Sequence, residues 1–168
     1  MERIEIENLA VQIRAARLED AGIITRHRYP GEMGEHLAVY EDWLPTVFIG
    51  GVYLGWLAQS DGRVIGGAGL LLINWQPSRT DPHPLRGRVV NVFVEPDFRG
   101  RGVARSLMQT ALAEARRLGL STLNLGTSEQ GRPLYASLGF QAAATEMWLK
   151  IKTEHGLSGD SPASNRIP

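Results

Sequence analysis

The stretch VVNVFVEPDFRGRGVARSL, from Val89 to Leu107, says most about how this chain folds. A run rich in β-branched residues stops at Pro96, a turn of arginines and glycines follows, and an amphipathic helical pattern then begins at once. A strand that leads through glycines into a helix brings unpaired backbone N–H groups to the positive end of the helix dipole. Such a turn favours binding of a phosphate group. The remaining question is which phosphate-containing ligand binds there.

The composition is that of an ordinary globular domain. The 168 residues are 43% hydrophobic and 21% charged, with a formal net charge of zero and no cysteine. A neutral chain argues against broad electrostatic binding of nucleic acid or of an anionic membrane. The lack of cysteine excludes disulfides and thiolate catalysis. No signal peptide or membrane-spanning run is recognisable, and we therefore expect a cytoplasmic protein.

The residues before the glycine turn alternate between helical and strand-like patterns. Pro45 is expected to limit the second helix, and Asp61-Gly62 suits a tight hairpin turn. Between the last two strands, 74–87 is expected to be a surface loop. The expected elements are a strand over 11–14, helices over 18–28 and 35–43, and strands over 53–59, 63–73 and 89–94.

The residues after the turn complete a mixed α/β pattern. The helix that follows the glycines carries one apolar stripe and ends at Gly119. The expected later elements are a strand over 122–125, a helix over 132–138 and a strand region over 140–151. We predict one α/β domain over 1–152, with a mixed central sheet flanked by helices, and a disordered tail over 153–168.

Two common phosphate-binding motifs do not fit the turn. A mononucleotide P-loop needs Lys and then Ser or Thr after its last glycine, but Val103 follows Gly102. A dinucleotide fingerprint needs a third glycine where Arg105 stands, and it needs an acidic residue after the next strand, which is absent.

Two motifs together resemble the GNAT family of N-acetyltransferases. The signature of that family is Arg or Gln, two residues, Gly, one residue, then Gly or Ala, and Arg99, Gly102 and Ala104 fill its positions. Downstream, Gly131–Phe140 contains a tyrosine before a Leu-Gly-Phe turn, as the family does. The resemblance covers about residues 62–150, and it implies the GNAT fold and an acetyl-CoA-dependent N-acetyltransferase.

The resemblance also implies where acetyl-CoA binds. Its pantetheine arm would pair with the backbone of Val92, Phe93 and Val94, and its pyrophosphate would lie on the N–H groups of the turn. Glycines allow this close approach, and arginines add positive charge, although the same residues could form a plain turn with solvated arginines. The other residues assigned to the cofactor are Arg99, Gly100, Arg101, Gly102, Val103, Ala104, Arg105 and, by a looser match, Ser128.

The resemblance assigns the general acid to Tyr135, which would protonate the departing thiolate. The alternative is a tyrosine that only packs, with its hydroxyl bonded to backbone. Many relatives place a base carboxylate on the strand that corresponds to 122–125, but this strand has no carboxylate here. Glu32 is therefore the first candidate for the base. The alternative is that Glu32 is only an exposed carboxylate in a loop. Asn91 could orient water or substrate, or lie in the ladder with its amide in solvent.

We therefore predict direct transfer of an acetyl group from acetyl-CoA to a primary amine in a ternary complex. No metal is expected, because the histidines lack metal-ligand spacing. The acceptor stays open among small amines, amino acids, antibiotics and protein N-termini. The alternatives are a non-catalytic CoA-binding regulatory module and a small nucleotide-binding domain. Exposed aromatic residues or the last strands could form a homodimer interface.

Overall fold

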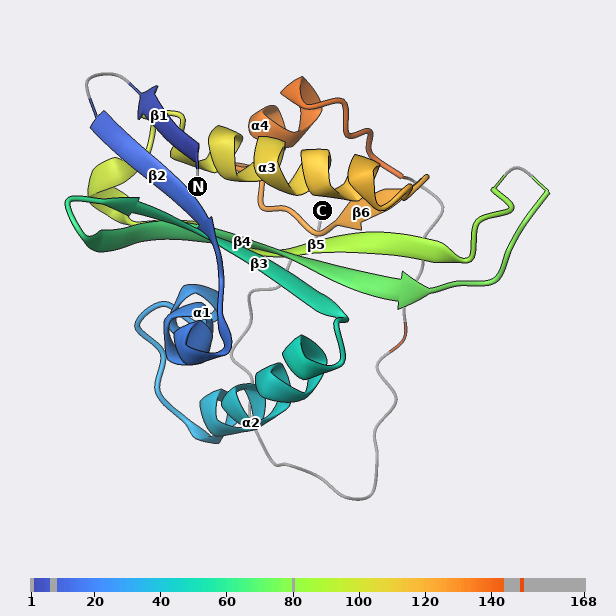
Figure 1. Cartoon of the computed structure of the whole chain (residues 1–168), viewed down its shortest axis with the longest axis horizontal. Helices are drawn as coiled ribbons and strands as arrows, with labels where there is room; N and C mark the ends of the chain where they lie inside the picture. Colours follow the sequence, from blue (N-terminus) through green and yellow to red (C-terminus); the bar gives the residue numbers. More distant parts are fainter. Residues whose placement is uncertain (1, 7–8, 80, 144–148, 150–168) are drawn as a thin grey trace. The chain divides into compact units, whose positions relative to one another are not determined.

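The computed structural model describes residues 2–6, 9–79, 81–143 and 149, and side chains from residue 9 onward. The chain divides into two compact units, Met1–Leu125 and Gly126–Pro168. Among the described residues, the first holds a six-stranded sheet and three α-helices, and the second holds the helix α4 (Arg132–Ser137) (Figure 1). The predicted tail over 153–168 lies outside the described residues.

The sheet is mixed, as predicted. Its strands lie in sequence order, each of the first four antiparallel to the next, and only the last pair, β5 and β6, is parallel. The strands are β1 (Glu2–Ile6), β2 (Leu9–Ala15), β3 (Tyr53–Ser60), β4 (Arg63–Asn74), β5 (Leu85–Val94) and β6 (Leu123–Leu125). The parallel pair needs a crossover, and the helix after the glycine turn supplies it.

The helices of the first unit lie on both faces of its sheet. Helices α1 (Ala21–Arg28) and α2 (Glu35–Ile49) cover one face, and α3 (Val103–Arg117) covers the other (Figure 1). On the α1 and α2 face the core contains Ile24, Leu44 and Tyr53. On the other face α3 buries the apolar stripe that the sequence predicts, with Leu107 and Met108 fully enclosed.

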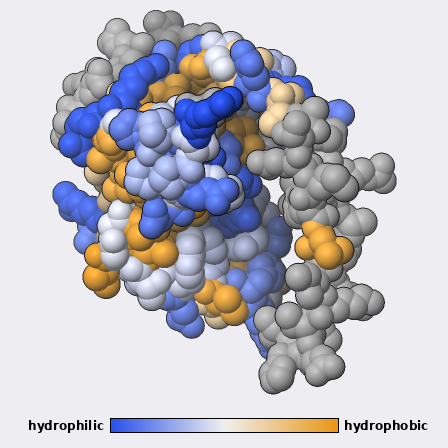
Figure 2. All heavy atoms as spheres, turned by 90° about the vertical axis from the view of Figure 1, so that its right-hand side faces the viewer, coloured by the Kyte–Doolittle hydropathy of each residue, from blue (hydrophilic) through white to orange (hydrophobic). Residues whose placement is uncertain are grey.

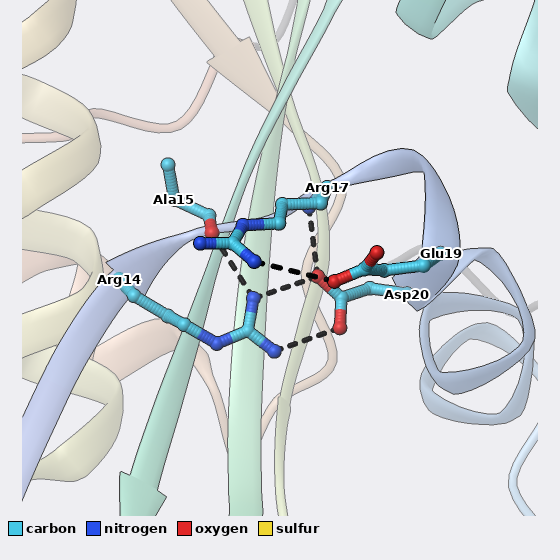
Figure 3. Close-up of polar contacts among 5 residues, drawn as sticks. All are labelled: Arg14, Ala15, Arg17, Glu19 and Asp20. Atoms are coloured by element: carbon cyan, nitrogen blue, oxygen red, sulfur yellow. Dashed lines mark hydrogen bonds and ion pairs between the residues drawn. The ribbon is translucent and has the colours of Figure 1, made fainter.

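A partly buried ion pair fixes the start of α1 against the sheet (Figure 3). The guanidinium of Arg14 on β2 donates to both carboxylate oxygens of Asp20, each at 2.7 Å. The backbone N–H of Arg17 donates to the same carboxylate at 2.7 Å, which closes the 3₁₀ turn Leu18–Asp20. The hydrogen bond from Arg14 holds the pKa of Asp20 below its ordinary value. The entry into α1 is therefore set by β2.

The hairpin between β3 and β4 confirms the predicted Asp-Gly turn. Asp61 has a φ of 48° and Gly62 a φ of 75°, the left-handed values that a two-residue hairpin turn requires at both positions. Strand β3 is one residue longer than predicted at the turn, β4 is one residue longer at its far end, and β5 begins at Leu85, four residues before the expected start. The loop before β5 is therefore residues 75–84, shorter than the expected 74–87.

The structure departs from the expected elements in three other places. Pro45 does not end α2, which continues to Ile49, because fully buried Leu44 and the packed Val47 and Phe48 offset the hydrogen bond that proline removes. The strand β1, made mostly of charged residues, was not predicted, and pairing with β2 accounts for it. Of the predicted strand over 140–151, the described residues 140–143 and 149 have no regular structure, and the rest lies outside the described residues.

No helix among the described residues is long and apolar enough to cross a lipid bilayer. On the face drawn in Figure 2, apolar residues lie scattered among hydrophilic ones. The large apolar side chains most exposed in the described first unit are Met33, Val39, Ile49, Trp75 and Leu18.

Candidate functional site

The glycine turn has the backbone geometry of an anion site. Gly100 and Gly102 have φ of 74° and 84°, values that favour glycine, and Gly102 is the N-cap of α3. The first helical hydrogen bond runs from the N–H of Ser106 to the carbonyl of Gly102 at 3.1 Å. Among the described residues, the N–H groups from Gly100 to Ala104 have no backbone acceptor. The turn thus presents several donors at the positive end of α3.

The arginines of the turn are arranged differently from one another. Arg99 donates from Nε to the carbonyl of Val94 at 2.9 Å, and its guanidinium lies 5.9 Å from the ring centre of Phe93. Arg101 lies over the ring of Phe98, at 6.0 Å, and Arg105 is exposed on the first turn of α3. Arg99 therefore ties the turn to the end of β5, a contact that the sequence does not predict.

The last residues of β5 have a neighbouring strand on one side only. The parallel pairing with β6 ends at Val89 and Leu125, whereas the antiparallel pairing with β4 continues to Val94. Among the described residues no strand pairs with the other edge of Val92, Phe93 and Val94. These are the three residues that the sequence analysis assigns to the pantetheine arm, and their open edge can accept an extended ligand.

A bulge lies at the start of this open edge. Gly67 pairs with Phe93 and Gly69 pairs with Val90, so that two residues of β5 face one residue of β4. Asn91, one of the two, has a φ of 55°. The expectation that its amide is in solvent is wrong: Nδ2 donates to the hydroxyls of Tyr40 at 2.6 Å and Tyr53 at 3.1 Å. Burial raises the pKa of both tyrosines.

A small pocket lies beside the bulge, between α1 and the sheet. Its lining includes His27, Tyr53, Gly67 and Asn91. His27 is 8% exposed, and its ring stacks on Phe93 with ring centres 4.7 Å apart. Burial lowers the pKa of His27 from 6.5 to about 4, so this imidazole is neutral at pH 7. Sequence reasoning missed His27, because a lone histidine on a helix carries no spacing signal.

The segment between α1 and α2 carries the candidate base in an exposed position. Glu32 accepts from Nε2 of His36 at 3.0 Å, and its side chain is 55% exposed. Two aromatic contacts connect this segment with α2, because Tyr29 meets His36 and Tyr40 edge-on, and within α2 Tyr40 packs against Trp43. Tyr40 in turn contacts Asn91, so these side chains form a continuous row from an exposed carboxylate to the β5 bulge.

The second unit holds the candidate general acid. Tyr135 lies on α4, half-buried, and its ring meets Phe140 edge-on at 6.0 Å. Burial raises the pKa of Tyr135, so its phenol stays protonated at neutral pH. No hydrogen bond to its hydroxyl is formed within the described residues. Ser128, which the sequence links to the cofactor, accepts from the N–H of Gly131 at 3.3 Å and precedes α4.

Comparison with known proteins decides the family. A sequence model of the acetyltransferase (GNAT) family matches residues 19–140, which is most of the chain. The chain belongs to the GNAT family. The crystal structure of a GCN5-related N-acetyltransferase from Ralstonia eutropha JMP134 is 32% identical, has a TM-score of 0.76, and aligns over 84% of this GNAT chain and 98% of that one. The predicted fold is thereby confirmed.

Other relatives of this GNAT chain agree with the assignment. A glucosamine 6-phosphate N-acetyltransferase from Trypanosoma brucei brucei is 32% identical over 93 residues, which are 55% of this chain and 61% of that protein. The matches cover less than half of the other curated relatives' length. A predicted acetyltransferase from Clostridium acetobutylicum, whose structure was solved with acetyl-CoA, has the same fold, with 21% identity, a TM-score of 0.76, and coverage of 84% of this chain and 96% of that one.

The structure brings some of the predicted site residues together and leaves others apart. The turn from Arg99 to Arg105 and the β5 edge from Val92 to Val94 are joined by the Arg99 contact. Glu32 reaches the bulge only through a row of rings. Tyr135 and Ser128 belong to the second unit. In the part of the chain that the structure describes, no group of three or more His, Asp or Glu side chains could hold a metal ion.

Proposed function

We propose that this chain transfers the acetyl group of acetyl-CoA to a primary amine by direct attack in a ternary complex. One observation carries the proposal: an open, bulged strand edge is followed, after the 3₁₀ turn Pro96–Phe98, by the glycine turn, whose N–H groups from Gly100 to Ala104 have no backbone acceptor among the described residues. A pantetheine arm and a pyrophosphate need those two features in that order. Membership of the GNAT family supports the same donor.

In the proposed reaction the amine nitrogen attacks the thioester carbonyl carbon. A C–N bond forms, negative charge develops on the carbonyl oxygen, and a backbone N–H of Phe93 or Val94 stabilises it. The C–S bond then breaks and the sulfur leaves with the electron pair. The amide product and free CoA form once one proton has left the nitrogen and one has reached the sulfur.

We assign the two protons to two side chains. Tyr135 gives its phenolic proton to the departing thiolate, and burial that raises its pKa keeps that proton in place at neutral pH. Glu32 accepts the proton of the attacking amine, directly or through water. The acceptor itself stays unassigned. A cytoplasmic location and a homodimer belong to the same set of proposals.

Release of free thiol from acetyl-CoA, measured with a panel of small amines, amino acids and peptides, tests the activity. Tyr135→Phe should lower kcat about 100-fold, the scale of general-acid catalysis, while calorimetric affinity for acetyl-CoA stays unchanged. Phe140→Leu is the matched control, because it removes the ring that packs on Tyr135 and keeps the hydroxyl.

The two outcomes of this experiment have different meanings. If the chain binds acetyl-CoA but releases no thiol with any acceptor, the result would favour the regulatory module over the enzyme. Equal losses of turnover in Tyr135→Phe and Phe140→Leu would assign Tyr135 to packing and remove it from the reaction.

A further inference from the structure

Asn91 is in an unusual conformation for a residue within a strand. Among the described residues, only Asp61 and Asn91 have a positive φ without being glycine. Asp61 lies in a hairpin turn that requires such a φ, whereas Asn91 lies inside β5. A left-handed backbone conformation costs a residue other than glycine about 1–2 kcal/mol, and this cost is smaller for Asn than for most residues. Something in the surrounding structure must therefore hold it.

The amide of Asn91 supplies that restraint. Its Nδ2 bonds to the hydroxyls of Tyr40 on α2 and Tyr53 on β3. We call these three residues the Asn91 bridge. Tyr53 is only 2% exposed, and its hydroxyl fits because Gly69 on β4 has no side chain: an added Cβ would collide with Tyr53 Oη. Three elements thus meet on one amide at the bulge.

The bridge lies where the donor strand opens. Pairing with β6 stops two residues before Asn91, and the open edge continues through Val92 to Val94. A bulge directs the backbone groups that follow it, because the extra residue shifts the alternation of the strand. Any change in the φ of Asn91 therefore moves the N–H and carbonyl groups that would meet the pantetheine arm.

We propose that the Asn91 bridge is a positioning device for acetyl-CoA, which holds the β5 bulge in its binding geometry and ties it to α2. This inference rests on the proposed function, since it names residues that support the same donor site. Tyr40 lies on α2, which packs on the sheet face opposite α3. Affinity for the donor is consequently controlled in part by a residue remote from the glycine turn.

Acetyl-CoA affinity, measured by calorimetry with no acceptor present, tests the bridge. Tyr40→Phe and Tyr53→Phe each remove one hydrogen bond and should weaken binding about 5-fold. Asn91→Gly keeps the backbone conformation and loses both bonds, for a loss of about 10-fold. Asn91→Ala also strains the backbone and should lose about 30-fold or more. Adding Tyr40→Phe to Asn91→Gly should change nothing further, because the bridge is already broken.

Asp61 provides the matched control. Asp61→Ala and Asp61→Gly make the same two backbone changes at the other left-handed position, the hairpin turn between β3 and β4. Asp61→Ala should lower the melting temperature, and both variants should bind acetyl-CoA as the wild type does. A drop in affinity limited to the Asn91 and tyrosine variants separates positioning from general destabilisation.

Wild-type affinity in Asn91→Gly and Tyr40→Phe, with or without a lower melting temperature, would overturn the inference and leave the proposed function standing. A wild-type chain that does not bind acetyl-CoA would overturn both. If Asn91→Ala fails to fold, Asn91→Gly and the two tyrosine variants still decide the matter, because they add no backbone strain.

Discussion

The two sides of the proposed site are built in different ways. The donor side, the β5 edge and the turn from Arg99 to Arg105, is made mainly of backbone: a bulge, left-handed glycines, and N–H groups from Gly100 to Ala104 that have no backbone acceptor among the described residues. The proposed acceptor side, the segment 27–43 that carries the candidate base, is made of side chains: His27 against Phe93, a row of aromatic rings, and an exposed carboxylate. A backbone site suits one ligand common to a family, whereas a side-chain site can change with each acceptor.

The largest effect should come from disturbing the donor backbone. Gly102→Val places a β-branched residue at a φ of 84° and blocks the approach to the turn. Strain of about 1–2 kcal/mol adds to lost charge-assisted hydrogen bonds of about 1.5–3 kcal/mol each, so acetyl-CoA affinity should fall more than about 100-fold.

Gly119→Ala is the control for that variant. It strains a left-handed glycine at the other end of α3, where φ is 70° and an added Cβ meets nothing within 4 Å. It should lower stability and leave acetyl-CoA affinity unchanged. Equal affinity losses at both ends of α3 would mean that the helix, and not its N-terminal turn, matters for binding.

A change on the acceptor side should lower turnover and leave the affinity for acetyl-CoA unchanged. Glu32→Gln removes the proposed base, and kcat/KM for the acceptor should fall about 100-fold at pH 7. The loss should shrink as the pH approaches the pKa of the acceptor amine, because the free amine then needs no base. Glu35→Gln, an exposed carboxylate at the start of α2, is the control. The same small loss in both variants would remove Glu32 from the mechanism.

His27 should make the stability of the acceptor side depend on pH. Its pKa is about 4 in the folded chain and ordinarily 6.5, so the unfolded chain binds a proton first as the pH falls. The contribution of neutral His27 to the free energy of unfolding should therefore be complete above pH 6.5, and the free energy of unfolding should drop by about 2–3 kcal/mol towards pH 4. Urea unfolding at pH 7 and 4.5 measures this, and His27→Gln should remove most of the slope. If the free energy of unfolding of His27→Gln depends on pH as that of the wild type does, other groups cause the dependence.

The smallest effect is expected at Ser128, before α4. Ser128→Ala should weaken acetyl-CoA binding about 5-fold, the value of one hydrogen bond, if this hydroxyl meets the cofactor. Ser137→Ala, a serine later in the same unit whose hydroxyl bonds to the carbonyl of Leu134, should have no effect on affinity. Identical affinities in the two variants would exclude Ser128 from the donor site.

The same contrast explains what the sequence could predict. The glycine turn, the Asp61-Gly62 hairpin and the amphipathic α3 are local patterns, and the structure confirms them. The sequence could not predict that α2 continues past Pro45, because burial of Leu44 and packing of Phe48 arise only in the folded chain.

The contacts of Asn91 were also beyond sequence reasoning. Tyr40 and Tyr53 lie 51 and 38 residues away along the chain, and nothing in local spacing relates them to β5. An asparagine within a run of β-branched residues is itself a signal, since Asn tolerates left-handed φ. That signal indicates a bulge but does not name the side chains that hold it. His27 had no signal at all.

A calorimetric titration of the chain with acetyl-CoA, run in parallel with a nicotinamide dinucleotide, tests the central claim most directly. The donor site described above predicts saturable binding of one acetyl-CoA per chain, lost in Gly102→Val and kept in Gly119→Ala, with no binding of the dinucleotide. Failure to bind acetyl-CoA, or a preference for the dinucleotide, would contradict the assignment of the glycine turn to the pyrophosphate of CoA.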